Sequence, residues 1–176
     1  MLVSLIGYRA TGKTTIAQLV ASRLGWNWSD ADVEIERRAG KSIRRIFAED
    51  GESAFRDMEA RTIADLCRRD RLVLATGGGA PMRPETREAL RAAGKVVWLQ
   101  ARPETILARM AGDATTAARR PNLTNHGALE EILQLLQRRE PIYEETADLA
   151  LDTEGREPAA LATAIIEQLN LAPSGL

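Results

Sequence analysis

The segment Gly7–Thr14 carries the strongest chemical signal in the sequence. It reads G-Y-R-A-T-G-K-T, fits the pattern G-x-x-x-x-G-K-[ST], and lies between an apolar stretch and a helical pattern. Backbone N–H groups of such a loop surround phosphates at a helix N-terminus, where the helix dipole favours negative charge. Lys13 would reach the β- and γ-phosphates, and the Thr14 hydroxyl would bind Mg²⁺. The residues expected to contact a nucleotide are Ala10, Thr11, Gly12, Lys13, Thr14 and Thr15.

Two carboxylates, Asp30 and Asp32, follow the second predicted strand. In an extended segment they would point to the same face and repel each other unless positive charge lies nearby. A Mg²⁺ ion beside the phosphates would supply that charge. One carboxylate would then hold the water shell of the metal, while the other orients or deprotonates an acceptor hydroxyl. The alternative is an Asp cap on the following helix, but next to the phosphate loop we favour the functional interpretation.

Arg56 and Glu59 stand three residues apart in a helical pattern and can form an ion pair. In isolation, a surface pair is the stronger interpretation. In a binding site, Glu59 would instead orient the guanidinium to grip a carboxylate through two hydrogen bonds. Gly77–Gly79 follow a buried strand and would leave backbone N–H groups open to a ligand, although a flexible turn would look the same.

Two further arginine segments lie near the C-terminal half. The polar stretch 112–127 contains Arg119 and Arg120 and has the length of a lid, from which an arginine can stabilise transferring phosphate charge. A solvated loop is the alternative. Pro141 lies inside a helical pattern, where a kink could aim Arg139 inward; otherwise Arg138 and Arg139 are solvated.

Short apolar runs alternate with helical patterns along the chain, which predicts a parallel sheet covered on both faces. Ligands on such sheets bind outside the carboxyl ends of the strands, where the segments above lie. Strands are expected at 2–6, 27–30, 72–75, 96–99 and 148–151. Helices are expected at 14–24, 33–39, 42–50, 53–69, 84–94, 103–110, 128–145 and 158–169.

The composition of the chain argues against several classes of function. The chain has 176 residues, 44% of them hydrophobic, which indicates one globular domain. A net charge of -1 argues against nucleic acid as a partner. One cysteine and one histidine exclude a disulfide and a Cys-rich zinc site; His126 is expected to be solvated and Cys67 inert. There is no signal peptide and no apolar run long enough to cross a membrane, so we expect a cytosolic protein without membrane contact. We expect a monomer, although the near-neutral charge also permits a dimer.

Taken together, these segments resemble shikimate kinases over nearly the whole chain. Each later motif is weak alone, but their order and spacing are specific. The resemblance rests on the phosphate loop, Asp30-x-Asp32 followed by Ile35-Glu36, Phe55-Arg56-x-x-Glu59, Gly77-Gly78-Gly79, Arg120-Pro121 and Arg139-x-Pro141-x-Tyr143.

The resemblance implies a three-layer P-loop NTPase fold of the nucleoside-monophosphate-kinase type. Its five-stranded parallel sheet would have the order 2-3-1-4-5. Residues 1–176 would form one domain, with substrate-binding helices at about 32–60 and a lid at about 111–127. The implied reaction transfers the γ-phosphoryl group of ATP to the 3-hydroxyl of shikimate, a step toward chorismate and the aromatic amino acids.

The same resemblance implies roles for individual residues. Asp32 would contact the acceptor hydroxyl, and Lys13 and Arg120 would serve the phosphates. Arg56 and Arg139 would clamp the shikimate carboxylate, and Gly78 would donate from its backbone. The further substrate-binding residues would be Glu59, Gly77 and Gly79. Thr14 and, through water, Asp30 would serve Mg²⁺, while Arg109, Arg156 and Pro158 would flank the adenine.

One position departs from the family pattern. The family usually has glycine where Ala10 stands, and alanine lacks the freedom of glycine at positive φ, so nucleotide affinity would fall if the loop needs that conformation. The nearest alternative functions are related kinases for gluconate or a nucleoside monophosphate. A GTP-dependent switch would carry an N-K-x-D motif, which is absent, and the net charge and single short domain disfavour a nucleic-acid-remodelling ATPase.

Overall fold

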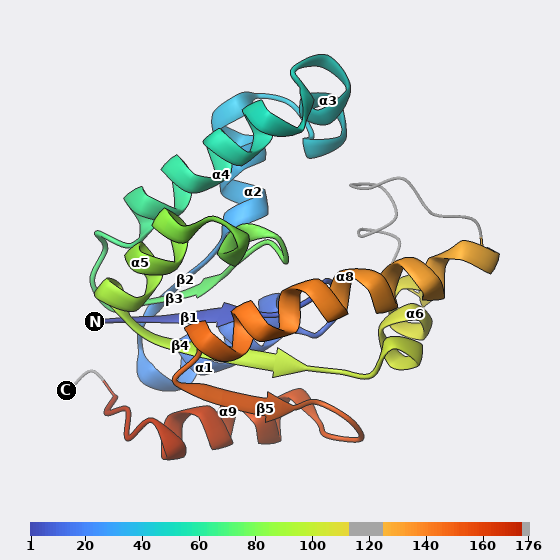
Figure 1. The fold of residues 1–176 in the computed structure, drawn as a ribbon. Coiled ribbons are helices and arrows are strands. Elements are labelled where there is room, and N and C mark those ends of the chain that lie inside the picture. The colour runs from blue at the N-terminus through green and yellow to red at the C-terminus, as the bar shows by residue number, and fades with distance from the viewer. Residues whose placement is uncertain (113–124, 174–176) are drawn as a thin grey trace.

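The computed structural model describes residues 1–112 and 125–173 (Figure 1). Its strands lie within two residues of the predicted ranges, and each predicted helix is present. In chain order the elements are β1 (Leu2–Ile6), α1 (Lys13–Leu24), β2 (Asn27–Asp30), α2 (Ala31–Ala39), α3 (Ile43–Glu49), α4 (Gly51–Leu66), β3 (Leu72–Ala75), the 3₁₀ turn η1 (Ala80–Met82), α5 (Pro84–Ala93), β4 (Gly94–Gln100), α6 (Pro103–Gly112), α8 (Asn125–Thr146), β5 (Leu149–Asp152) and α9 (Pro158–Gln168).

The strands form one parallel sheet of five in the order β2-β3-β1-β4-β5, which confirms the expected topology. β1 lies at the centre and is buried along its whole length, as an apolar run between two helical layers should be. β2 lies at one edge and is more polar and exposed. The carboxyl ends of the strands therefore meet at one side of the sheet, where ligands of such folds bind.

Helices cover both faces of the sheet (Figure 1). One face packs on α1 and α9, with Ile16, Val20 and Ile165 among the buried residues of that layer. The other packs on α4, α5 and α8, where Ile63, Leu90 and Tyr143 are buried. The three layers confirm the predicted α/β architecture, because a parallel sheet must hide both of its apolar faces.

Two smaller hydrophobic clusters hold the parts that extend beyond the sheet. α2, α3 and α4 share a cluster of Ile35, Ile43, Ile46 and Phe55, and these helices extend outward together in Figure 1. α6 and α8 share another cluster, into which the Tyr8 side chain of the phosphate loop inserts. The regions around the strand ends therefore have cores of their own, which keep their functional side chains in place.

The largest boundary differences are three residues, at the end of α4 and at the start of α8. Gly94 follows α5 but also begins β4, because it pairs with Leu2 so closely that a Cβ there would overlap the backbone of Leu2. Pro141 lies inside α8, which is continuous across it, rather than ending or breaking the helix. Within residues 1–112 and 125–173, no helix has both the length and the apolar character needed to cross a bilayer.

Candidate active site

The phosphate loop wraps around the ammonium group of its own lysine. Lys13 Nζ donates hydrogen bonds to the carbonyl oxygens of Gly7 at 3.0 Å and Tyr8 at 2.6 Å. Gly7 has a φ of 133°, and a Cβ there would lie 2.5 Å from the Leu99 carbonyl oxygen, so the turn out of β1 requires glycine. The loop thus leads directly from the central strand into α1, as the motif predicts.

Ala10 occupies the left-handed region, with a φ of 61°. This is the position where glycine is expected, and the structure shows that the loop does use positive φ there. A left-handed alanine costs about 1–2 kcal/mol relative to its ordinary conformations. The strain lies inside the segment predicted to bind nucleotide.

Asp30 serves two neighbours with its two carboxylate oxygens. Oδ1 accepts hydrogen bonds from the backbone N–H groups of Asp32 at 2.9 Å and Val33 at 3.3 Å and so caps α2. Oδ2 accepts a 2.6 Å hydrogen bond from the Thr14 hydroxyl. The helix-cap alternative is therefore confirmed, and the same carboxylate lies beside the hydroxyl predicted to bind a metal.

The premise that Asp30 and Asp32 extend to one face is wrong, because α2 begins at Ala31 and places Asp32 in its first turn. The Asp32 carboxylate instead lies against Gly77, together with that of Glu59. A Cβ on Gly77 would lie 2.9 Å from Asp32 Oδ1 and 2.7 Å from Glu59 Oε1. The helix cap thus directs one carboxylate to the phosphate loop and the other to the glycine segment.

Arg56 is held by carboxylates on its own helix, α4. Its Nη1 donates to Glu59 Oε2 at 2.7 Å, and Nη2 lies 3.4 Å from Glu52 Oε1. Glu59 is buried, so this is no surface ion pair. Burial acts to lower the pKa of Arg56, but the charge of Glu59 opposes it and the net effect is a raised pKa. The guanidinium is therefore always charged and has a fixed direction.

The glycine segment lets four side chains approach its backbone. A Cβ on Gly79 would lie 2.5 Å from Arg56 Nη1, and one on Gly78 would lie 3.5 Å from Arg139 Nη1. Gly77–Gly79 are not at positive φ, so the absence of side chains matters here more than backbone freedom. Asp32, Glu59, Arg56 and Arg139 thus gather around one short turn after β3.

Tyr143 ties α8 to this turn. Its buried hydroxyl donates a 2.5 Å hydrogen bond to the carbonyl oxygen of Gly78, and its ring packs against Trp98 with centroids 5.8 Å apart. Arg139 lies one helical turn before Tyr143, on the same side of α8. The hydrogen bond therefore fixes the distance between Arg139 and Gly78.

Arg109 connects the phosphate loop with the loop after β5. It donates from Nη1 to Thr153 Oγ1 at 3.0 Å and from Nη2 to the Thr153 carbonyl at 3.2 Å, and Nη1 lies 3.5 Å from the Ala10 carbonyl oxygen. The backbone N–H of Arg156 bonds to Thr153, and Pro158 begins α9 a few residues later. The three residues predicted to flank adenine therefore belong to one corner of the molecule.

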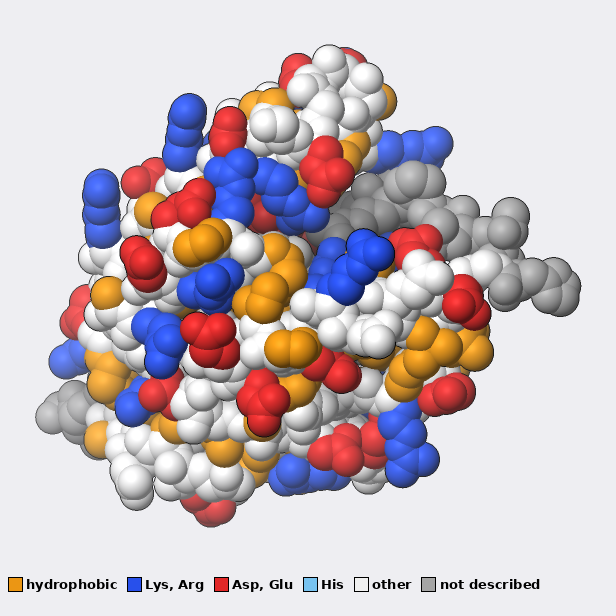
Figure 2. Space-filling view, in the orientation of Figure 1, with side chains coloured by type: hydrophobic (Ala, Val, Ile, Leu, Met, Phe, Trp, Pro, Cys, Tyr) orange, Lys and Arg blue, Asp and Glu red, His pale blue; other side chains and the backbone are white. Residues whose placement is uncertain are grey.

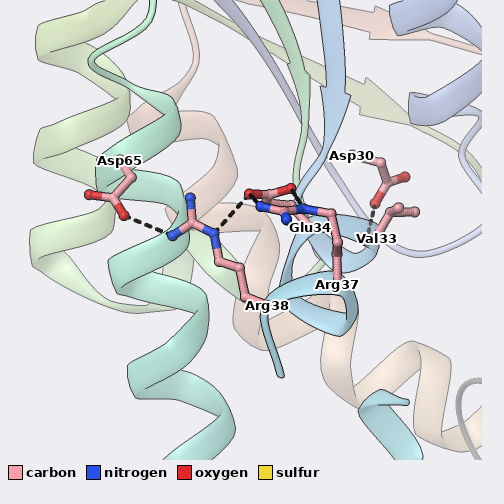
Figure 3. Close-up of polar contacts among 6 residues, drawn as sticks. All are labelled: Asp30, Val33, Glu34, Arg37, Arg38 and Asp65. Atoms are coloured by element: carbon pink, nitrogen blue, oxygen red, sulfur yellow. Dashed lines mark hydrogen bonds and ion pairs between the residues drawn. The ribbon is translucent and has the colours of Figure 1, made fainter. Parts of the chain in front are cut away.

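Basic side chains gather around the site. Figure 2 shows Lys and Arg on both sides of the depression that separates the α3–α4 region from α8. α2 and α4 are joined by an ion-pair network in which Arg38 contacts Glu34 at 2.8 Å and Asp65 at 2.7 Å (Figure 3). The helices that bear Asp32 and Arg56 are thus fastened to each other at their outer face.

Comparisons with known proteins agree on one family. The family model for shikimate kinase matches residues 9–170. The chain belongs to the shikimate kinase family. A curated shikimate kinase from Rhodopirellula baltica is 43% identical over 98% of this chain and 90% of its own length. One from Moorella thermoacetica is 42% identical over 95% of this chain and 93% of its own length.

Solved structures of shikimate kinases share the fold. A shikimate kinase from Acinetobacter baumannii in complex with shikimate superposes with a TM-score of 0.89 at 35% identity, covering 96% of this chain and 92% of that one. A shikimate kinase from Bacteroides thetaiotaomicron gives a TM-score of 0.88 at 28% identity over 97% and 99% of the two chains. The sheet order and helical layers described above are thus those of known shikimate kinases.

Part of the predicted shikimate kinase site lies outside the described residues. Arg119, Arg120 and most of the lid predicted at 111–127 fall within 113–124, and the structure says nothing of the side chain of His126. Cys67 is half-buried, and burial raises the pKa of its thiol to about 11, in line with an unreactive residue. The remaining predicted residues lie around the carboxyl ends of β1, β2, β3 and β5.

Sequence reasoning missed several residues of this site. Thr153 holds Arg109, the Tyr143 hydroxyl holds Gly78, and the Tyr8 ring contacts two arginines. The sequence signals were weak: Tyr8 and Arg9 fill variable positions of the phosphate-loop pattern, and Tyr143 was noted only as part of a motif. Their roles depend on contacts between distant segments.

Proposed function

We propose that this chain phosphorylates the 3-hydroxyl of shikimate with ATP, giving shikimate 3-phosphate and ADP. One observation carries the proposal beyond the family: Asp32, Arg56 and Arg139 meet at Gly77–Gly79, beside the phosphate loop. An anionic, polyhydroxylated acceptor needs a carboxylate for one hydroxyl and arginines for its acid group. The chain brings both together around one turn of the backbone.

The chemistry is mainly positioning and charge stabilisation. Asp32 orients the attacking hydroxyl and accepts its proton, while Arg56, directed by Glu59, and Arg139 bind the carboxylate. Gly78 donates its backbone N–H to the acceptor. On the other side, the backbone of Ala10–Thr15 surrounds the phosphates and Lys13 exchanges its loop carbonyl partners for phosphate oxygens. Arg109, Arg156 and Pro158 flank the adenine.

The donor set beside the phosphate loop fits Mg²⁺. Thr14 and Asp30 place a hydroxyl and a carboxylate oxygen 2.6 Å apart, and Mg²⁺ prefers oxygen ligands from one or two side chains together with waters and substrate phosphates. When bound, the ion neutralises charge on the phosphates. Thr14 would be a direct ligand, and Asp30 would act through water while it caps α2.

The domain assignment follows from the same roles. Residues 1–176 form one domain, in which helices at about 32–60 bind the acceptor and the segment at about 111–127 is a lid. Arg120, from that lid, stabilises the transferring phosphoryl group. We expect the chain to act as a monomer.

A coupled assay of ADP release tests the proposal. The purified chain is given MgATP and, in separate reactions, shikimate, gluconate and a nucleoside monophosphate. We expect ADP release with shikimate at a kcat/KM at least 100-fold above the other acceptors. Equal or greater release with gluconate would assign the related sugar-acid reaction instead, and folded protein with no shikimate-dependent release would refute the proposal.

A further inference from the structure

Two guanidinium groups share one buried aromatic ring at the base of the site. The side chain of Tyr8 is 2% exposed, and its ring centroid lies 5.7 Å from Arg9 Cζ and 5.6 Å from Arg139 Cζ. An aromatic ring attracts each cation, but two cations on one ring also repel each other. The arrangement therefore concentrates positive charge at a point between the phosphate loop and α8.

Neither arginine is neutralised by the described parts of the chain. Across residues 1–112 and 125–173, the ion pairs include Arg56 with Glu59 but none with Arg9 or Arg139. Arg9 Nε is buried and finds no acceptor among the described residues. A buried donor of a charged group without an acceptor is costly, and an anionic ligand removes that cost.

Arg9 also lies at the acceptor turn. A Cβ on Gly78 would be 3.4 Å from the backbone nitrogen of Arg9 and 3.5 Å from Arg139 Nη1. Tyr8, which supports both arginines, is fixed by Ile106 of α6 and by Ile132 and Leu136 of α8. The pair of guanidiniums is thus held in place before any ligand arrives.

We propose that Arg9 is a further acceptor-binding residue, which binds the acceptor carboxylate together with Arg139. The inference rests on the proposed function. The carboxylate is favoured over the nucleotide phosphates because Arg9 shares its ring with Arg139 and adjoins Gly78, whereas the phosphates already have Lys13 and the loop backbone. Arg9 would thus make the first half of the phosphate loop part of the acceptor pocket.

Steady-state kinetics of Arg9→Met and Arg9→Lys test this role. Arg9→Met approximates the aliphatic stem of the side chain and removes its guanidinium group and charge; Arg91→Met makes the same change at an exposed arginine on α5 and is the matched control. We expect Arg9→Met to raise KM for shikimate at least tenfold and KM for ATP less than twofold. Arg9→Lys should give an intermediate rise, because lysine keeps the charge but not the planar donor pair.

A second acceptor identifies the group that Arg9 binds. Shikimate methyl ester carries a neutral ester in place of the carboxylate, so Arg9→Met should lower kcat/KM for the ester by less than threefold while lowering that for shikimate at least tenfold. Equal losses for both acceptors, or a selective rise in KM for ATP, would overturn the proposal in favour of phosphate contact.

The outcomes separate this inference from the proposed function. A wild-type chain without shikimate-dependent ADP release refutes the function, and the role of Arg9 with it. An active wild type with unchanged constants in Arg9→Met refutes the role of Arg9 alone. Thermal melting is followed for each variant, and if Arg9→Met melts below the assay temperature, the same KM comparison on Arg9→Lys decides.

Discussion

The nucleotide side and the acceptor side of this site are built in different ways. On the nucleotide side, one continuous segment from Gly7 to Thr14 supplies the loop, the lysine and the hydroxyl, and Lys13 bonds to the backbone of its own loop. On the acceptor side, Asp32, Arg56 and Arg139 come from α2, α4 and α8 and meet only because the turn after β3 has no side chains.

The difference shows which parts of the chain determine phosphate binding and which determine the choice of acceptor. A local loop binds phosphates through backbone geometry, which a few glycines and one lysine determine. An acceptor pocket made from three helices depends on their packing and on buried partners such as Glu59. We therefore expect substitutions on the two sides to separate in kinetics, affecting constants for ATP or for shikimate but not both.

The largest separation is expected for Asp32→Asn. Loss of the carboxylate that accepts the hydroxyl proton should lower kcat about 100-fold or more, because the amide cannot take a proton. Binding of ATP should change less than threefold. Steady-state kinetics and equilibrium titration with ATP measure the two effects, with Asp70→Asn as an exposed control; unchanged turnover would remove Asp32 from its assigned role.

Gly79→Ala should affect the acceptor side through shape alone. The new Cβ would lie 2.5 Å from Arg56 Nη1 and displace the guanidinium from its bond with Glu59. Small misplacements of binding groups can cost about 10–100-fold in rate, so KM for shikimate should rise about tenfold while KM for ATP stays within twofold.

Ser22→Ala, at an exposed position of α1 outside the assigned site, is the control. It should leave both KM values unchanged. A Gly79→Ala enzyme with wild-type KM for shikimate would show that Arg56 does not need its present position.

Ala10→Gly should affect the stability of the nucleotide side and not its affinity. Glycine adopts the φ of 61° at this position without steric cost. Because the described loop already has this φ, relief of the strain should raise the free energy of unfolding by up to about 1 kcal/mol in urea titrations, while KM for ATP changes less than twofold. Arg71→Gly, at a φ of 51° outside the assigned site, is the comparison and should behave in the same way. A fall in KM for ATP of threefold or more in Ala10→Gly alone would show that the strain opposes nucleotide binding.

The smallest effect is expected for the ion-pair network that joins α2 and α4. Hydrogen bonds from Arg37 and then Arg38 lower the pKa of Glu34 from 4.5 to about 2. Because this pKa is lower in the folded state, the network stabilises the fold above pH 4.5 and loses that effect as the pH falls toward 2. Glu34→Gln should therefore lower the free energy of unfolding at pH 7 by less than about 1 kcal/mol, and the difference should vanish near pH 2 in urea titrations. A difference that persists there would indicate packing and not charge.

The sequence was sufficient to predict most of the fold, for physical reasons. Buried parallel strands such as Leu2–Ile6 are unbroken apolar runs, and Gly25 and Gly40 end helices in left-handed caps. Sheet order was less accessible, because periodicity does not specify which strands pair. It came from the resemblance to shikimate kinases, and the structure confirmed it.

Site residues that belong to one continuous motif were predictable from the sequence, whereas contacts between distant segments were not. The phosphate loop is one motif, so Lys13 and Thr14 were evident from spacing. The directions of the Asp30 and Asp32 side chains were not evident. The residue at which α2 begins decides whether the two carboxylates point to the same side or to different sides. The contacts of Tyr143 with Gly78 and of Tyr8 with Arg139 could not be predicted from the sequence, since they join segments far apart in the chain.

The shared carboxylate of Asp30 has a consequence for redesign. One oxygen caps the helix that bears Asp32, and the other bonds to Thr14 in the phosphate loop. The first helix of the acceptor side therefore starts from a residue that is also bonded to the phosphate loop. A redesign of α2–α4 for a different acceptor would keep this connection to the phosphoryl donor only if its first helix started from the same aspartate.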